Sequence, residues 1–102
     1  MWLDGYMYAI SIALDTAKLQ ETYGKPSWQN AYTDIKLFLE KEGGIWQQGS
    51  VYFGDKERVN AVTCVVATSK MSALWPWFSA SVRDIQMLRI EENGDLSPAL
   101  NR

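Results

Sequence analysis

Residues 7–16 constrain the fold more than any other stretch, because their side chains fall on two unlike faces of an expected β-strand. The bulky apolar positions share one face: Tyr8, Ile10, Ile12 and Leu14. The small or slightly polar positions share the other: Met7, Ala9, Ser11, Ala13 and Asp15. We expect helices to cover the bulky face. The small face leaves room for a second subunit, a metal ion or a substrate, although a buried strand whose faces differ only in packing would give the same pattern.

The middle of the chain predicts a long helix followed by extended structure. Residues 16–23 form a short connection, either helical or irregular. Apolar residues at helical spacing predict a helix over residues 28–41, which ends at Gly43 and Gly44. Residues 45–54 indicate an extended segment, and the glycine at its centre favours two short strands or one bent strand.

The last third of the chain predicts a second helix and a final strand. The β-branched residues of segment 59–74 favour a strand, whereas its spacing and length favour a helix that Pro76 ends. Residues 81–91 predict a strand, residues 92–102 form a tail that is a candidate edge strand, and residues 1–6 are an N-terminal extension. This order predicts an α+β fold with two helices on one face of an antiparallel sheet, as in ferredoxin-like sandwiches.

Composition narrows what such a domain can do. The length of 102 residues suits one domain, which we assign to residues 1–102, and its five Trp residues indicate an apolar patch for a partner subunit. The absence of histidine removes imidazole catalysis and nearly all zinc sites. A net charge of −2 requires any phosphate contact to come from a local Arg or Lys cluster. The lone Cys64 suits a reducing cytoplasm, and we expect neither a membrane span nor a signal peptide.

Five segments together resemble the virulence-associated protein D (VapD) family over residues 7–100. In the order of the chain, they are MYAI (7–10), NAYTDI (30–35), WQQGSVYFGD (46–55), SVRDI (81–85) and LRIE (88–91). The resemblance implies a ferredoxin-like homodimer related to the small CRISPR-associated nucleases. It also implies endoribonuclease activity, often as the toxin of a toxin–antitoxin pair, and it favours a helix for segment 59–74.

One position of the first strand departs from the family. The family reads Met-Tyr-Ala-Ile-Ala-Phe-Asp-Leu-Asp-Thr there, with the first Asp as the proposed catalytic residue. That Asp falls on Ala13 of this chain, while Asp15 matches the second Asp. Replacement of this Asp by Ala is the change made to silence a toxic nuclease, although natural loss would give the same sequence. The resemblance therefore implies an endoribonuclease that is inactivated at residue 13.

Metal-dependent RNA cleavage asks for carboxylates that hold Mg²⁺ beside the scissile phosphate. One such Asp from each subunit, meeting across a two-fold axis, would supply two ligands. Ala13 removes this ligand. Asp15 lies two residues on, about 6–7 Å away along a strand, and substitutes for it as a metal ligand only if the strand end bends.

Further side chains are candidates for RNA contacts. Gln48, Ser50 and Tyr52 share one face of an extended segment and either hydrogen-bond RNA or form the polar side of an edge strand. Arg83 and Arg89 either hold phosphate or pair with neighbouring acids.

Other residues favour a structural role. Asp84 is a structural acid at the start of a strand or a metal ligand. Trp75, Trp77 and Phe78 pack in the core or at a dimer interface, or stack on bases. Cys64 is a small core residue.

Two functions follow from these observations. The first is an RNA-cleaving homodimer, a toxin with a cognate antitoxin, that is disabled at Ala13. The second is a ferredoxin-like dimer that binds RNA or an antitoxin without chemistry, which the missing carboxylate and the acidic composition favour.

Overall fold

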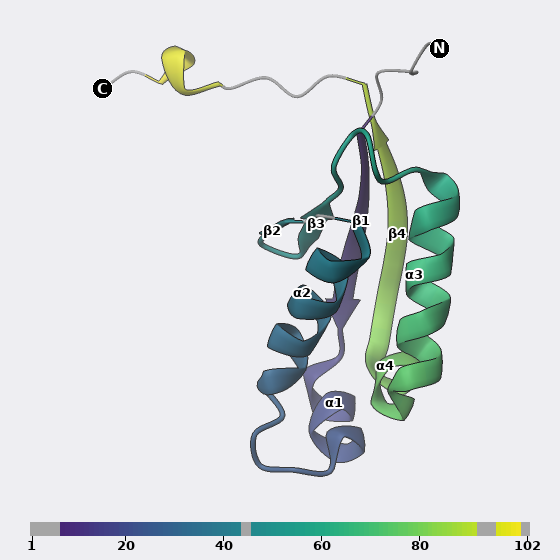
Figure 1. Ribbon diagram of the computed structural model, residues 1–102. Helices are drawn as coiled ribbons and strands as arrows, with labels where there is room; N and C mark the ends of the chain where they lie inside the picture. The colour runs from purple at the N-terminus through teal and green to yellow at the C-terminus, as the bar shows by residue number, and fades with distance from the viewer. Residues whose placement is uncertain (1–6, 44–45, 92–95, 101–102) are drawn as a thin grey trace.

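The computed structural model describes residues 7–43, 46–91 and 96–100, and its strands form one antiparallel sheet (Figure 1). The strands are β1 (Met7–Leu14), β2 (Trp46–Gln48), β3 (Val51–Phe53) and β4 (Val82–Ile90). Their spatial order is β2-β3-β1-β4, so the two strands that are far apart in the sequence, β1 and β4, lie side by side. This order and the antiparallel pairing confirm the predicted α+β, ferredoxin-like architecture.

Helices occupy one face and one end of this sheet. They are α1 (Thr16–Tyr23), α2 (Asn30–Gly43), α3 (Ala61–Leu74) and α4 (Pro76–Ser81). The long helices α2 and α3 cover the same face, as predicted, while α1 and α4 pack against each other beyond the end of β1 (Figure 1). No helix of the described residues is long and apolar enough to cross a membrane.

Local chemistry explains where the helices begin and end. The Asp15 side chain caps α1, and Gly24 ends it in the left-handed conformation with φ of 75°. Asn60 and Thr63 form a reciprocal capping box at the start of α3, which confirms the helical alternative for this segment. Helix α2 begins at Asn30, two residues later than predicted, because residues 26–29 form a turn first.

The core lies between the covered face of the sheet and the two long helices. The bulky residues of β1 enter it as predicted, with Ile10 and Ile12 buried and Tyr8 and Leu14 packed against them. Helices α2 and α3 supply the opposite side of the core: Ala31, Ile35, Leu39, Cys64, Ala67 and Met71. These contacts fix which face of β1 lies inside and which lies outside.

Three details differ from the sequence prediction or refine it. Segment 45–54 is two short strands, β2 and β3, joined by a two-residue turn at Gly49 and Ser50, rather than one bent strand. Ser81 belongs to α4, a short helix that the sequence did not predict, and β4 begins one residue later. In the described part of the tail, Ser97–Ala99 forms a 3-10 helix, and residues 92–95 and 101–102 lie outside the described residues. Residues 1–6 of the expected extension lie outside the described residues.

Candidate functional site

The face of the sheet away from α2 and α3 is open, because no described helix lies over it; we call it the open face. Along β1 it carries Met7, Ala9, Ser11 and Ala13, which are the small positions predicted from the sequence. Ala9 is nevertheless only 1% exposed, because its partners in the register, Phe53 and Leu88, are large. The open face therefore has an apolar part around Ala9 and a more polar part near the end of β1.

The polar part of the open face is formed by β1 and β4. Ala13 lies directly opposite Asp84, and Ser11 lies opposite Gln86. Gln86 Nε2 donates a hydrogen bond to Asp84 Oδ1 at 3.0 Å. Directly opposite residues of an antiparallel pair have Cβ atoms about 4.5–5.5 Å apart. A carboxylate at residue 13 would therefore lie beside the Asp84 carboxylate on one surface.

Ser50 is brought to the same end of β1 by the turn between β2 and β3. The backbone amide of Ile12 donates to the carbonyl of Ser50 at 3.0 Å. This bond places the turn beside Ile12, the residue that precedes Ala13. Gly49 precedes it with φ of 65°, a conformation that favours glycine at the first position of a two-residue hairpin turn. Of the three predicted polar contacts on the extended segment, Ser50 is thus exposed and near the polar part of the open face.

Tyr52 does not belong to this site, and its assignment as an RNA contact is wrong. It is 3% exposed and lies in the core under the helices. Burial, with the nearby Tyr32, raises the pKa of its hydroxyl, so it remains neutral. Across the turn, Gln48 pairs with Val51, and Tyr52 pairs with Gln47.

Asp15 has a structural role at the start of α1. Its Oδ1 accepts a hydrogen bond from the backbone amide of Lys18 at 3.1 Å, which satisfies an otherwise free amide of the first helical turn. Its own amide donates to the carbonyl of Ser81 at 2.8 Å, and the β1–β4 register shifts between Ala13 and Leu14. Asp15 therefore links β1, α1 and α4 instead of continuing the open face.

The two predicted phosphate contacts lie at opposite ends of β4. Arg83 is exposed and precedes Asp84 in the sequence, at the point where the β1–β4 register shifts. Arg89 lies opposite Tyr8, at a position of the helix-covered side. Six residues of extended chain separate the two arginines, or about 20 Å. They do not form one anion site, and of the two only Arg83 is adjacent to Asp84 in the sequence.

The aromatic cluster and Cys64 belong to the core. Trp75 and Trp77 stack with ring centroids 5.0 Å apart. Trp77 and Phe78 are buried. The cluster lies at the end of the molecule where α1 packs against α4. The cluster therefore packs the core, as one of the two interpretations predicted. Burial raises the pKa of the Cys64 thiol, which excludes a thiolate nucleophile near neutral pH and confirms a small core residue.

The described residues offer few ligands for a metal ion. They contain no group of three or more His, Cys, Asp or Glu side chains close enough to hold one. At the polar part of the open face, Asp84 is the carboxylate present, since Ala13 occupies the opposite position. The sequence alone leaves Asp84 as either a structural acid or a metal ligand. The pairing of the first and last strands in a ferredoxin-like sheet is the signal that would have placed it opposite residue 13.

Fold and site together define a class: a small ferredoxin-like protein with a polar cluster at one end of an open sheet face. No model of a known protein family matches the chain. Individual proteins do match it. Endoribonuclease VapD 2 of Riemerella anatipestifer is 47% identical over 95 residues, which cover 93% of this chain and 100% of the relative. A homologue of endoribonuclease VapD from Helicobacter pylori is 49% identical over 94 residues, covering 92% and 96%. Endoribonuclease VapD of Dichelobacter nodosus is 38% identical over 91 residues, covering 89% and 94%.

The chain therefore belongs to the VapD family. The similarity spans nearly the full length of this chain and of each relative, so it includes both strands of the open face. This confirms the resemblance found from the sequence segments.

Proposed function

We propose that this protein is an endoribonuclease of the VapD family that binds RNA on the polar part of the open face. The names of its relatives support the activity. The observation that carries the location is the register, in which residue 13 lies directly opposite Asp84 on a surface without a described helix. A strand of RNA can approach such a surface, whereas the opposite face is filled by the core.

The residues of this surface suit RNA as a ligand. The Asp84 carboxylate can accept a hydrogen bond from a ribose 2′-hydroxyl, the group that distinguishes RNA from DNA. Gln86 orients that carboxylate through its hydrogen bond of 3.0 Å. The exposed Arg83, which precedes Asp84 in the sequence, can pair with phosphate. Because the net charge of the chain is −2, phosphate binding requires such a local positive charge.

We infer that the present sequence is impaired, because Ala13 leaves the surface with one carboxylate of the pair. Mg²⁺ is bound in proteins through one or two carboxylates together with substrate phosphates. An Asp at residue 13 would complete such a pair with Asp84, and the ion would then neutralise charge on the phosphate. Asp84 alone is a poor site, so we assign no metal-dependent step to the chain as it stands. Asp15, which caps α1, is not part of this donor set.

We also propose that the protein acts in the cytoplasm as a homodimer, as the toxin of a pair with a protein antitoxin. The small residues Ala9, Ser11 and Ala13 support self-association through the open face, because they let a second sheet approach closely. The exposed Leu88 adds an apolar contact on the same face. The single buried Cys64 fits a reducing compartment.

The test compares the chain with its Ala13→Asp variant in a ribonuclease assay on a labelled single-stranded RNA. We expect Ala13→Asp to raise Mg²⁺-dependent cleavage by about 10²-fold or more, the range for a properly placed acidic catalytic group. Adding Asp84→Asn to that variant should abolish the gain, while Asp15→Asn serves as the matched carboxylate control. If Ala13→Asp leaves the RNA intact over a range of pH and metals, this assignment is wrong.

A second candidate function is RNA or antitoxin binding without chemistry, and Ala13 is the observation that favours it. Binding would then use the same open face and would depend on salt, because Arg83 would pair with phosphate. Salt-sensitive RNA binding by both the chain and Ala13→Asp, with cleavage by neither, would support this function over the first.

A further inference from the structure

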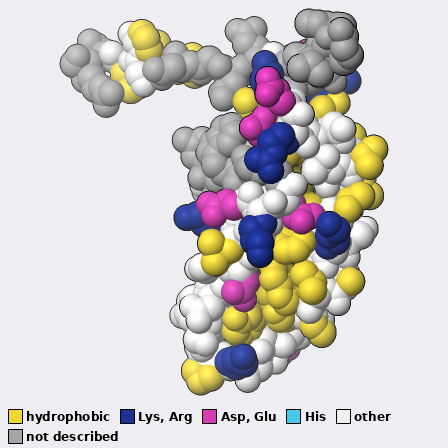
Figure 2. Space-filling model, viewed as in Figure 1, with side chains coloured by type: hydrophobic (Ala, Val, Ile, Leu, Met, Phe, Trp, Pro, Cys, Tyr) yellow, Lys and Arg dark blue, Asp and Glu magenta, His cyan; other side chains and the backbone are white. Residues whose placement is uncertain are grey.

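The outer surface of α3 is unusually apolar for a helix at the surface of the structure. Among its fourteen residues, Lys70 is the only charged one. Val62 and Val65 are exposed, and hydrophobic side chains follow the α3 edge of the molecule in Figure 2. A helix that is apolar on all sides is normally buried. This surface is therefore suited to contact with a further segment of protein.

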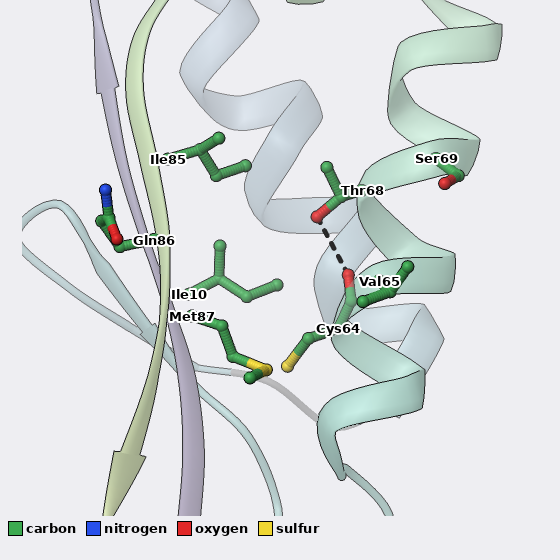
Figure 3. Close-up of a pocket in the computed structure, with 8 residues that line it drawn as sticks. All are labelled: Ile10, Cys64, Val65, Thr68, Ser69, Ile85, Gln86 and Met87. Carbon is green, nitrogen blue, oxygen red and sulfur yellow. Dashed lines mark hydrogen bonds between the residues drawn. The ribbon is translucent and has the colours of Figure 1, made fainter.

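A groove of about 240 Å³ continues this surface from α3 to β4, and we call it the α3–β4 groove. Met87 is 47% exposed at its sheet side, so the groove opens to the surroundings along β4. The Thr68 hydroxyl in the lining already donates a hydrogen bond to the carbonyl of Cys64 at 2.9 Å. The groove therefore suits an apolar occupant. The sheet and α3 supply a mostly apolar lining: Ile10, Ile85, Met87, Cys64, Val65 and Thr68 (Figure 3).

The described part of the carboxyl-terminal tail presents two leucines to water. Leu96 is 79% and Leu100 is 56% exposed, and they flank the single 3-10 turn at Ser97–Ala99. The amide of Leu100 donates to the carbonyl of Ser97 at 3.0 Å, which closes this turn. In Figure 1 the turn lies away from the sheet and the helices. The tail thus has an apolar side that gains free energy from leaving water.

The length of the tail matches the position of the α3–β4 groove. Residues 92–95 read Glu-Asn-Gly-Asp, and an Asn-Gly pair favours a tight reversal of the chain. Met87 lies six residues before Asn93, and Leu100 lies six residues after Gly94. A chain that reverses at this pair therefore runs back along β4 and returns Leu100 toward Met87.

The spacing of the two leucines also fits the groove. Four residues of 3-10 helix span about 8 Å, and two residues of a strand span about 7 Å, so Leu96 and Leu100 match alternate positions along β4. Cys64 lies beside Met87 in Figure 3, and Thr68 lies further along α3 toward Ile85. With Leu100 at Met87, Leu96 comes nearer the start of α3, where Val62 is exposed.

We propose that the carboxyl-terminal tail folds back on its own chain and closes over the α3–β4 groove as a strap, with Leu96 and Leu100 seated against it. The tether carries this choice of occupant. Only five residues separate the end of β4 from Leu96, so the chain's own tail has a high effective concentration at the groove. The strap covers apolar surface of α3 and leaves the open face, with Ala13 and Asp84, accessible to RNA.

The main test is a disulfide between the tail and the groove, formed in the full chain under mild oxidation. Cys64→Ala removes the one native thiol, and Val65→Cys with Leu100→Cys introduces an exposed pair. We expect most molecules to form this disulfide within one chain, because its geometry requires the two Cα atoms to approach within about 7 Å. Peptide mass and a non-reducing denaturing gel identify it.

The matched control replaces the groove cysteine by one on α2. Leu37 is also exposed, so Leu37→Cys with Leu100→Cys has a similarly accessible pair of thiols and should not cross-link within the chain. Equal cross-linking of both pairs overturns the proposal, as does the absence of the disulfide from the pair at the groove. A disulfide that forms only between two chains overturns it as well.

Replacement of the leucines tests the strap without added thiols. Leu96→Ser together with Leu100→Ser should lower the equilibrium constant for folding by about tenfold or more, because two apolar side chains no longer leave water on folding. Ala99→Ser, an apolar-to-serine change at an exposed position of the same turn, is the matched control and should leave this constant unchanged. Urea denaturation measures all three chains. An unchanged midpoint for the double leucine variant overturns the proposal.

Discussion

The two faces of β1 come from alternating residues of one strand, yet they have opposite roles. On the covered face, Ile10 and Ile12 pack against two helices and are almost fully buried. On the open face, Ser11 and Ala13 lie opposite polar partners on β4, and no described helix covers them. A change on the first face must alter the core, whereas a change on the second can alter chemistry alone. A substitution at residue 13, which we propose as the position of a catalytic carboxylate, can therefore leave the fold unchanged.

The largest expected effect contrasts neighbouring residues on the two faces. Ile10→Ala should destabilise the protein by about 2–5 kcal/mol, because it removes buried methyl groups and leaves a cavity. Ser11→Ala, one residue on, should change the free energy of unfolding by no more than about 0.5 kcal/mol. Urea denaturation followed by circular dichroism measures both. Equal effects would show that the open face is buried in the folded protein, for example by a second subunit.

A smaller effect tests where the site ends along β1. Asp15→Ala should cost about 1 kcal/mol, because the amide of Lys18 loses the carboxylate that caps α1. Asp15→Asn keeps an acceptor at the same position and should cost only a few tenths of that. Thermal unfolding of the two variants gives the comparison. A loss of RNA cleavage on Asp15→Asn in the Ala13→Asp chain, at unchanged stability, would return Asp15 to the site.

The smallest expected effect concerns the free energy of unfolding in alkaline solution, which depends on buried groups on the covered side of the sheet. Burial raises the pKa of the Cys64 thiol, so the folded protein keeps a proton that the unfolded chain releases as the pH rises above about 9. Stability is therefore full below that pH and falls as the pH rises through the folded-state pKa. Denaturation at several pH values should show a weaker alkaline decline for Cys64→Ala. The decline that remains belongs to groups such as Tyr52, whose pKa is also raised. An identical decline would mean that Cys64 is solvated.

Much of the fold could be predicted from local pattern, because its signals are local. The apolar stripe of α2 and the two faces of β1 follow from spacing alone. The pattern does not predict helix α4, because Pro76 indicates the end of a helix, whereas proline is also favoured at the first position of one. The turn at Gly49 and Ser50 was recognised as an irregularity, but its two-residue length decides which face each later residue occupies.

The candidate site was only partly predictable, since it depends on contacts between distant segments. Ala13 was found through the family pattern, and the register then placed Asp84 opposite it. No spacing within the sequence specifies that pairing, because 71 positions separate the two residues and the sheet brings them together. Tyr52 shows the converse error, because a polar side chain in an alternating pattern was assigned to the surface and lies in the core.

The turn between β2 and β3 also has a consequence for how proteins of this shape can diverge. It sits at the rim of the molecule, away from the core, and its length sets the pairing of every residue on both sides of it. An insertion or deletion of one residue there would exchange the outward and inward sets on β2 while the helices and β1 stay as they are. The groups that β2 presents at this edge of the sheet can thus be exchanged by a change of loop length, with no substitution in the core.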